Sequence, residues 1–279
     1  MATPQRSVLI TGCSDGGMGS ELAIAFHKAG LKVYATARNP AKMAKLAPYD
    51  RIELLALDVL SEASIAECVK KVPSLDILVN NAGQANPAPV ADMNIAEAKA
   101  LYDVNVWAPI AVIQVFLPLL LKSPSALIVN HTSVASVAPI PFQAAYNSSK
   151  AALSMLTDTL RLELQPFGVQ VVQLKTGGVK TNIGANSPPL TVPAGSLYEP
   201  AREAVQTTRD KAFADLGITA EQWAREVVGD LLRKNPSPAI WRGDSATTGR
   251  VAALLPYGTF DGMLKRMTGL DQVEKIVRK

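Results

Sequence analysis

Cysteine and histidine are nearly absent from this chain of 279 residues, which has two of each. Cys13 and Cys68 lie far apart with no second pair beside them, so no disulfide framework is predicted and we expect a reduced, cytoplasmic environment. His27 and His131 are too few and too widely separated to form a metal site, so we expect structural roles for both and no metal.

Clusters of like charge are also lacking. Lysine and arginine outnumber aspartate and glutamate by 28 to 24, and the isoelectric point is near 9.0, but the basic residues are scattered rather than gathered into a stripe. Such a distribution disfavours nucleic-acid binding. The formal charge of +4 would still help to attract a phosphorylated cofactor.

No secretory or membrane-spanning segment is expected. Residues 1–5 are polar and lack the charged start and long apolar region of a signal peptide. The most apolar stretch, residues 104–121, is uncharged but contains two prolines and follows polar helix signals, which predicts a buried helix rather than a bilayer span. Peripheral contact with a lipid surface stays open.

Internal repeats and low-complexity linkers are lacking too, so a single domain is predicted over residues 1–279. Hydrophobic residues make up 48% of the chain, which suits a well-buried core. Short apolar runs alternate with amphipathic stretches, the pattern of right-handed βαβ units. We therefore predict an α/β fold, a Rossmann-like, doubly wound parallel sheet with helices on both faces and about seven strands, at residues 7–11, 31–37, 52–59, 75–83, 125–133, 169–177 and 238–243.

The alternation weakens after Gly178. Residues 179–200 are rich in proline, serine, alanine and glycine, and we expect a substrate loop region over 183–218 because long loops in compact domains are usually functional or disordered. A helix follows, with Thr219 and Gln222 spaced as a capping box. The C-terminal tail, residues 257–279, is amphipathic in part and would cap the substrate pocket, join a subunit interface or touch a membrane surface.

A glycine-rich turn, TGCSDGGMG at residues 11–19, follows the first predicted strand and precedes a helix. Glycines there let the backbone approach a pyrophosphate, and the helix N-terminus supplies N–H groups. No lysine–serine or lysine–threonine pair follows, which disfavours a nucleoside-triphosphate P-loop. The turn predicts a dinucleotide site that involves Gly12, Ser14, Gly17, Met18 and Gly19.

The residues after the second and third strands indicate which dinucleotide binds. Arg38 stands where an acidic side chain would bind the ribose hydroxyls of NAD, and its guanidinium suits a 2′-phosphate. NADPH/NADP+ is therefore the predicted cofactor, the alternative being that Arg38 is a plain surface charge. Asp58 and Val59 are placed to meet the adenine.

Tyr146 and Lys150 lie four residues apart in a predicted helix over 144–164, which puts them on one face. A nearby positive charge favours the ionised form of a phenol, so Lys150 is expected to lower the pKa of Tyr146 from its usual value of about 10. A chance pair on a solvated face is the alternative. Ser133, thirteen residues before the tyrosine, and the sequence NNAG at residues 80–83 favour a site.

Together these motifs resemble those of the short-chain dehydrogenase/reductase family over roughly residues 6–182. Within that family, the glycine turn and TGGVKTN are similar to those of fungal and yeast NADPH-dependent acyl-dihydroxyacetone-phosphate reductases and related ketoreductases. The last glycine of the turn comes one residue later than usual, which leaves open whether Gly16 or Gly17 contacts the phosphates, and Thr176 stands where a proline is common. The resemblance is carried by the glycine turn, Asp58–Val59, NNAG, Asn105, Ser133, YNSSK at 146–150 and TGGVKT at 176–181.

The resemblance implies a catalytic tetrad of Asn105, Ser133, Tyr146 and Lys150. Tyr146 would protonate a carbonyl oxygen that also accepts a hydrogen bond from Ser133. Lys150 would hold the nicotinamide ribose, and Asn105 would position a water beside Lys150 unless it bonds helix backbone instead. Further cofactor contacts are implied for Asn81, Ala82, Gly83, Gly177, Val179 and Thr181, the last to the nicotinamide carboxamide or a phosphate.

The predicted function is NADPH-dependent reduction of a ketone in a fairly apolar, lipid-like or natural-product substrate, because the loop after residue 182 carries no charge before Glu199. Isomerisation or cyclisation of a natural product in the same site is one alternative, and a non-catalytic NADP-binding regulator is another. The family also implies a homodimer or homotetramer formed through the helices that carry Asn105 and Tyr146.

Overall fold

The computed structural model describes residues 5–181, 188–214, 217–256 and 258–278. Its centre is a parallel sheet of seven strands, as the sequence predicts, and the strand order is β3–β2–β1–β4–β5–β6–β9. The strands are β1 (Ser7–Ile10), β2 (Lys32–Ala37), β3 (Ile52–Ala56), β4 (Ile77–Asn80), β5 (Leu127–Ser133), β6 (Gln170–Thr176) and β9 (Ala239–Arg242).

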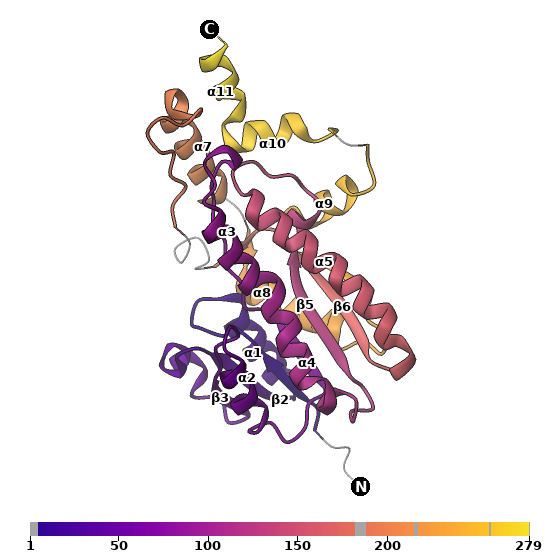
Figure 1. Ribbon diagram of the computed structural model, residues 1–279. Helices are drawn as coiled ribbons and strands as arrows, with labels where there is room; N and C mark the ends of the chain where they lie inside the picture. The colour runs from indigo at the N-terminus through magenta and orange to yellow at the C-terminus, as the bar shows by residue number, and fades with distance from the viewer. Residues whose placement is uncertain (1–4, 182–187, 215–216, 257, 279) are drawn as a thin grey trace.

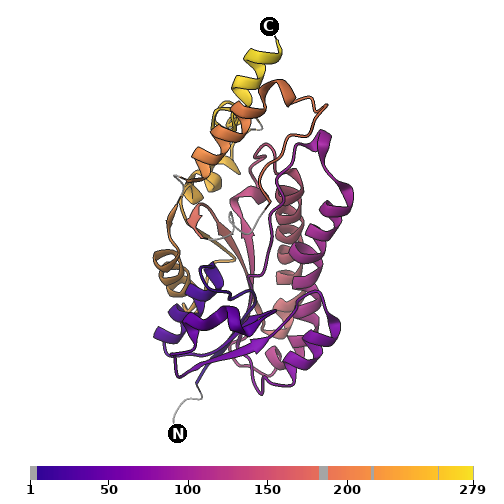
Figure 2. The same cartoon turned by 90° about the vertical axis from the view of Figure 1, so that its left-hand side faces the viewer.

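Helices cover both faces of the sheet (Figures 1 and 2). One face packs against α1 (Met18–Lys28) and α8 (Ala220–Leu231), and the other packs against α2 (Glu62–Val69), α4 (Ala108–Leu120) and α5 (Ala144–Leu164). Strand β1 shows why its sequence is apolar throughout: Val8 and Ile10 belong to the first core, and Leu9 belongs to the second. Side chains alternate between the faces of a strand, so a strand covered on both sides is apolar at every position.

Local signals set the helix ends. Gly30 has a positive φ of 92°, and its N–H donates to the His27 carbonyl at 2.9 Å, which ends α1 as predicted. At the start of α8 the Thr219 hydroxyl accepts from the Gln222 N–H at 3.2 Å, whereas the Gln222 side chain bonds Glu226. Only the Thr219 half of the predicted capping box is therefore formed.

One helical stretch runs from residue 95 to residue 120 and includes α3 (Ile95–Tyr102), a π turn (Asp103–Trp107) and α4. Its length and composition would allow it to cross a bilayer, but half of its most apolar window is buried in the fold. Phe116 and Leu120 are fully buried in the second core. This packing is that of the buried helix predicted for residues 104–121.

The region after β6 is more ordered than the predicted loop over 183–218, because it contains the helix α7 (Arg202–Ala214). Helices α10 (Asp261–Thr268) and α11 (Leu270–Val277) pack against α7 and form a lobe beyond the sheet (Figures 1 and 2). Residues 182–187 and 215–216 of the predicted loop lie outside the described residues. The remaining elements are α9 (Ala246–Ala252), the strand pair β7 (Val179–Lys180) and β8 (Ile218–Thr219), and 3₁₀ turns at Pro40–Leu46, Val90–Asp92, Val134–Ser136, Gln165–Phe167 and Glu199–Ala201.

The strand order reverses between β1 and β4, which lie side by side at the centre of the sheet. In open parallel sheets the crevice at such a switch point, outside the carboxyl ends of the strands, is where ligands bind. The predicted motifs follow the carboxyl ends of β1 to β6, so the topology brings them to this one edge.

Candidate active site

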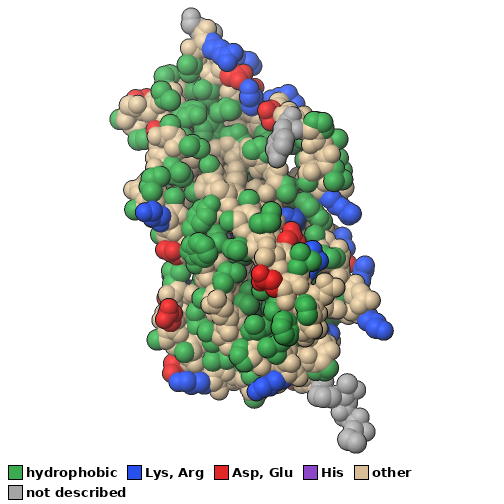
Figure 3. All heavy atoms as spheres, turned by 45° about the vertical axis from the view of Figure 1, so that its right-hand side comes forward, with side chains coloured by type: hydrophobic (Ala, Val, Ile, Leu, Met, Phe, Trp, Pro, Cys, Tyr) green, Lys and Arg blue, Asp and Glu red, His purple; other side chains and the backbone are tan. Residues whose placement is uncertain are grey.

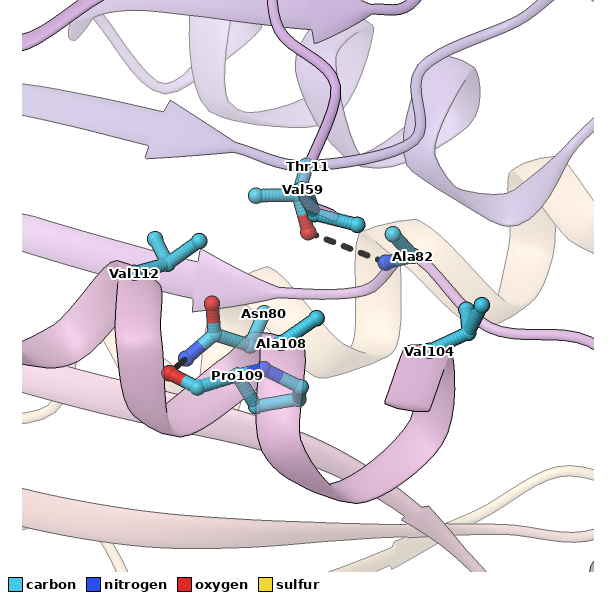
Figure 4. Close-up of a pocket in the computed structure, with 8 residues that line it drawn as sticks. All are labelled: Thr11, Val59, Asn80, Ala82, Val104, Ala108, Pro109 and Val112. Atoms are coloured by element: carbon cyan, nitrogen blue, oxygen red, sulfur yellow. Dashed lines mark hydrogen bonds between the residues drawn. The ribbon is translucent and has the colours of Figure 1, made fainter. Parts of the chain in front are cut away.

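The glycine turn after β1 is bonded directly to the NNAG segment after β4. The Thr11 hydroxyl accepts from the N–H groups of Asn81 at 3.0 Å and Ala82 at 2.9 Å, and Figure 4 shows Thr11 and Ala82 facing each other. The Asn81 side-chain amide donates to the carbonyls of Thr11 and Gly12 at 2.8 and 3.1 Å. Two motifs 70 residues apart therefore form one cradle.

The glycines of the turn have different tasks. Gly16 has a positive φ of 76° and makes the left-handed step, whereas Gly17 is the N-cap of α1 in extended conformation. A Cβ on Gly19 would lie 2.5 Å from the Gly12 carbonyl oxygen and 2.6 Å from Asn81 Nδ2, so only glycine allows this close approach. A bare backbone turn that leads into a helix N-terminus fits a pyrophosphate, and Gly17 rather than Gly16 stands at that terminus.

The predicted adenosine contacts lie at the ends of the neighbouring strands. Arg38 is exposed directly after β2, and no ion pair of Arg38 is found within the described residues. The Asp58 carboxylate accepts from the Leu60 N–H at 3.1 Å, which holds the loop after β3. Val59 lines a small gap (Figure 4) together with Thr11, Asn80, Ala82, Val104, Ala108, Pro109 and Val112.

Ser133, Tyr146 and Lys150 come together as predicted. Ser133 is the last residue of β5, and its buried hydroxyl is close enough to the Tyr146 phenol to affect its pKa. The same hydroxyl donates to the Thr176 carbonyl at 3.4 Å and accepts from the Ala135 N–H at 3.1 Å. Lys150 lies one turn along α5 from Tyr146, with its ammonium 5.8 Å from the centre of the phenol ring. The ammonium donates to the backbone carbonyl of His131 at 2.8 Å.

Burial reverses the predicted direction of the Tyr146 pKa. Desolvation raises the pKa of the phenol, and the hydrogen bond from Ser133 offsets this only in part. The net change in the Tyr146 pKa is therefore opposite to the lowering predicted from Lys150, because burial dominates. Burial also lowers the pKa of the Lys150 ammonium, from 10.5 to about 8. The phenol is therefore protonated at neutral pH, the form that can give a proton to a substrate oxygen.

Asn105 is fully buried in the π turn and anchors the chain just after NNAG. Its side chain donates to the Gln84 carbonyl at 2.9 Å and accepts from the Gln84 N–H at 2.9 Å, so it bonds loop backbone rather than helix backbone. It also donates to the hydroxyl of Ser149 at 3.1 Å, a contact that the sequence analysis missed. A Cβ on Gly83 would lie 3.3 Å from Asn105 Oδ1 and 3.5 Å from Lys150 Nζ, so both polar groups approach the backbone of NNAG closely.

The segment after β6 is held by the turn after β9. Gly177 donates to the Arg242 carbonyl at 2.9 Å, and Gly178 donates to the Asp244 carbonyl at 2.8 Å. A Cβ on Gly177 would lie 1.9 Å from the Asp244 carbonyl oxygen, so this position requires glycine. Val179 then pairs with Ile218 across β7 and β8, and Thr181 ends this described segment. The predicted nicotinamide loop thus starts beside Ser133, which pairs in register with Thr176.

Both histidines make hydrogen bonds that suit the structural roles predicted for them, but they lie in different parts of the fold. His27 bonds Asp50 at 2.9 Å, outside the strand-end edge. His131, however, is buried in the middle of the site, with both ring nitrogens hydrogen-bonded. The available signal was the polar run NHTS at 130–133 within a strand that is otherwise buried and apolar.

Comparison with known proteins gives one consistent result. A family model described as short chain dehydrogenase matches residues 6–189. A short-chain dehydrogenase/reductase of Pestalotiopsis microspora is 53% identical over 282 residues, which covers 100% of this chain and 99% of the relative. The NADPH-dependent 1-acyldihydroxyacetone phosphate reductase of Schizosaccharomyces pombe is 38% identical over 275 residues, 92% of each chain.

The fold also matches solved structures. The crystal structure of a short-chain dehydrogenase from Streptomyces avermitilis superposes with a TM-score of 0.78 at 25% identity, over 97% of this chain and 98% of that one.

Proposed function

The chain belongs to the short-chain dehydrogenase family, and on that premise we propose that it is an NADPH-dependent oxidoreductase that reduces a ketone of an apolar, lipid-like or natural-product substrate to an alcohol. One observation carries this proposal: a protonated Tyr146, the Ser133 hydroxyl and the Lys150 ammonium meet at the carboxyl end of β5. These are the groups that a carbonyl oxygen needs when it becomes an alcohol.

Each residue has a separate task in this proposal. NADPH, when bound, supplies the hydride. Tyr146 holds the proton that the carbonyl oxygen accepts, and Ser133 donates a hydrogen bond that stabilises the developing negative charge on that oxygen. Lys150, with a pKa of about 8, is mostly protonated at neutral pH and would replenish the proton, with Asn105 positioning a water beside its ammonium. The cradle of Gly12, Gly17 and Gly19 holds the pyrophosphate.

Arg38 supports the choice of NADPH over NADH. Its guanidinium is exposed immediately beyond β2, where a 2′-phosphate of the adenosine ribose would lie, and no carboxylate stands at that position in the chain. The printed name of the relative from Schizosaccharomyces pombe describes it as NADPH-dependent, which agrees with this choice.

The lobe beyond the sheet supports an apolar substrate. Phe142, four residues before Tyr146, is buried in a cluster with Leu190, Val205 and Val273, and its ring meets Tyr198 edge to face at 5.2 Å. This apolar cluster, so close in sequence to Tyr146, supports an apolar substrate. The Schizosaccharomyces pombe relative is named as a reductase of 1-acyldihydroxyacetone phosphate, whose acyl group is apolar.

Turnover by Tyr146→Phe tests the proposed acid. NADPH oxidation is measured against a panel of apolar ketones, with Tyr102→Phe on α3 as the matched control. Loss of a general acid should lower kcat by about 10²- to 10⁴-fold, while NADPH binding and Tyr102→Phe stay near wild type. Wild-type turnover by Tyr146→Phe would rule out its role as proton donor.

A homodimer through the helices that carry Asn105 and Tyr146 also belongs to the proposal. Trp107, Met155 and Leu162 are 57%, 69% and 59% exposed on these helices, and Figure 3 shows hydrophobic side chains spread over the face of the molecule that it presents. Apolar surface of this kind is covered in stable oligomers. Light scattering of wild type and Met155→Glu tests this: a dimer or tetramer that the substitution shifts to monomer is expected, and a monomeric wild type would contradict it.

A further inference from the structure

The His131 imidazole bridges two of the segments that form the proposed cofactor site. Its Nδ1 lies 3.0 Å from Oδ1 of Asn81, after β4, and its Nε2 lies 2.7 Å from Oγ1 of Thr176, at the end of β6. The ring is buried and stacks on Trp223 at 5.3 Å between centroids. Both ring nitrogens thus have a hydrogen-bond partner, and Trp223 on α8 fixes the orientation of the ring.

The neighbouring bonds determine where the ring proton lies. The Asn81 amide nitrogen already donates to two carbonyls, those of Thr11 and Gly12, so its Oδ1 must be the acceptor toward His131. His131 therefore carries its proton on Nδ1, and Nε2 accepts from the Thr176 hydroxyl. Burial and the charge of Lys150 lower the His131 pKa to about 3, so the ring is neutral at every pH at which the protein would work.

Directed in this way, the hydrogen bonds form one chain that runs from Thr176 through His131 to Asn81, and then to the carbonyls of Thr11 and Gly12. One end is the segment that leads into the nicotinamide loop, and the other end is the pyrophosphate turn. The backbone carbonyl of His131 accepts from Lys150 as well. A proline in place of Thr176 would offer no hydroxyl and would leave Nε2 without this donor.

We propose that His131 is a positioning residue that, paired with Thr176, couples the segment holding the nicotinamide to the turn holding the pyrophosphate. The inference rests on the proposed function only in that NADPH is the ligand of both segments. Its consequence is that the Thr176 hydroxyl, which lies on the nicotinamide side, contributes to the affinity for the whole cofactor through His131.

The test uses substitutions that differ in a single group. Thr176→Val removes the hydroxyl at nearly constant shape, and Thr176→Ser keeps the hydroxyl and removes a methyl group. His131→Phe keeps a ring against Trp223 but loses both hydrogen bonds, and it is made alone and together with Thr176→Val. The readouts are the NADPH dissociation constant from cofactor fluorescence, the melting temperature, and KM for NADPH and for the ketone.

Thr176→Val should raise the NADPH dissociation constant and KM about tenfold, the usual effect of leaving one buried partner unpaired. Thr176→Ser should stay within about twofold of wild type, and KM for the ketone should be unchanged within the same margin. In the His131→Phe background, Thr176→Val should add less than about twofold, because the hydroxyl has already lost its partner.

Three results would overturn the proposal. The first is that the variants melt at lower temperature yet bind NADPH with the wild-type dissociation constant. The second is that Thr176→Ser binds NADPH as weakly as Thr176→Val does, and the third is that the effects of His131→Phe and Thr176→Val on the dissociation constant multiply independently. Because cofactor binding is measured without turnover, a protein that binds NADPH but reduces no ketone would refute the proposed function and leave this test intact.

Discussion

The buried, charged ammonium of Lys150, a proposed catalytic group, should lower the free energy of unfolding at neutral pH. Its side chain is 5% exposed, and burial lowers the pKa of its ammonium from 10.5 to about 8. One pKa unit corresponds to about 1.4 kcal/mol, so carrying the charge into the fold costs about 3 kcal/mol at pH 7. The ammonium also donates to the His131 carbonyl at 2.8 Å.

The sign of the pH dependence follows from where the proton binds more tightly. The unfolded chain holds the proton up to about pH 10.5 and the folded chain only up to about pH 8, so the cost is complete below pH 8 and disappears as the pH rises toward 10.5. Lys150→Met removes this titration. Its loss of the hydrogen bond to His131 is the same at every pH, and we therefore expect its stability relative to wild type to fall by about 2 kcal/mol between pH 7 and 9.5.

Urea unfolding, followed by the fluorescence of the three tryptophans, measures this difference at several pH values. Lys122→Met, at an exposed lysine just after α4, is the matched control for replacing a lysine by methionine. Lys150→Met should also lose ketone reduction. A stability difference between Lys150→Met and wild type that is constant from pH 7 to 9.5 would refute the reasoning that burial controls this lysine.

Three further outcomes are expected. Arg38→Asp should raise KM for NADPH about tenfold or more and leave KM for NADH nearly unchanged, because it removes a charged partner of the 2′-phosphate. Steady-state kinetics with both cofactors measures this, and equal effects on the two KM values would contradict it. Gly177→Ala should destabilise the fold by about 1–3 kcal/mol, because its Cβ meets a backbone carbonyl at 1.9 Å. A Cβ on Gly229 in α8 would have nothing within 4 Å, so Gly229→Ala should instead leave the melting temperature unchanged or raise it. Similar losses of stability at both positions would contradict this prediction. The thiols of Cys13 and Cys68, whose pKa values burial raises to about 12 and about 11, should resist a thiol reagent at pH 7 until the protein is unfolded, and rapid labelling of the native protein would show otherwise.

Local sequence patterns predicted much of the fold. Short apolar strands, their alternation with helices and the glycine turn predicted the seven-stranded parallel sheet, because strand periodicity and turn chemistry depend on residues a few positions apart. The helix over 202–214 escaped prediction, since its composition is polar and its ordering depends on packing against α10 and α11. The π turn at Asn105 also escaped prediction, because residues 104–121 are apolar nearly throughout and show no distinct face whose shift would mark the extra residue.

The chain by itself determined the identity and order of the chemical groups: a bare glycine turn, an arginine after the second strand, and a serine, tyrosine and lysine in fixed succession. Only the tertiary structure decided their electrostatics and their partners. Burial, which a sequence does not reveal, raised the pKa of Tyr146 where its neighbour Lys150 alone would have lowered it. Register between β5 and β6 set Ser133 opposite Thr176, and the pairing of β4 with β5 brought His131 within reach of Asn81. Parallel strands thus join residues 45 to 50 positions apart that no local pattern connects.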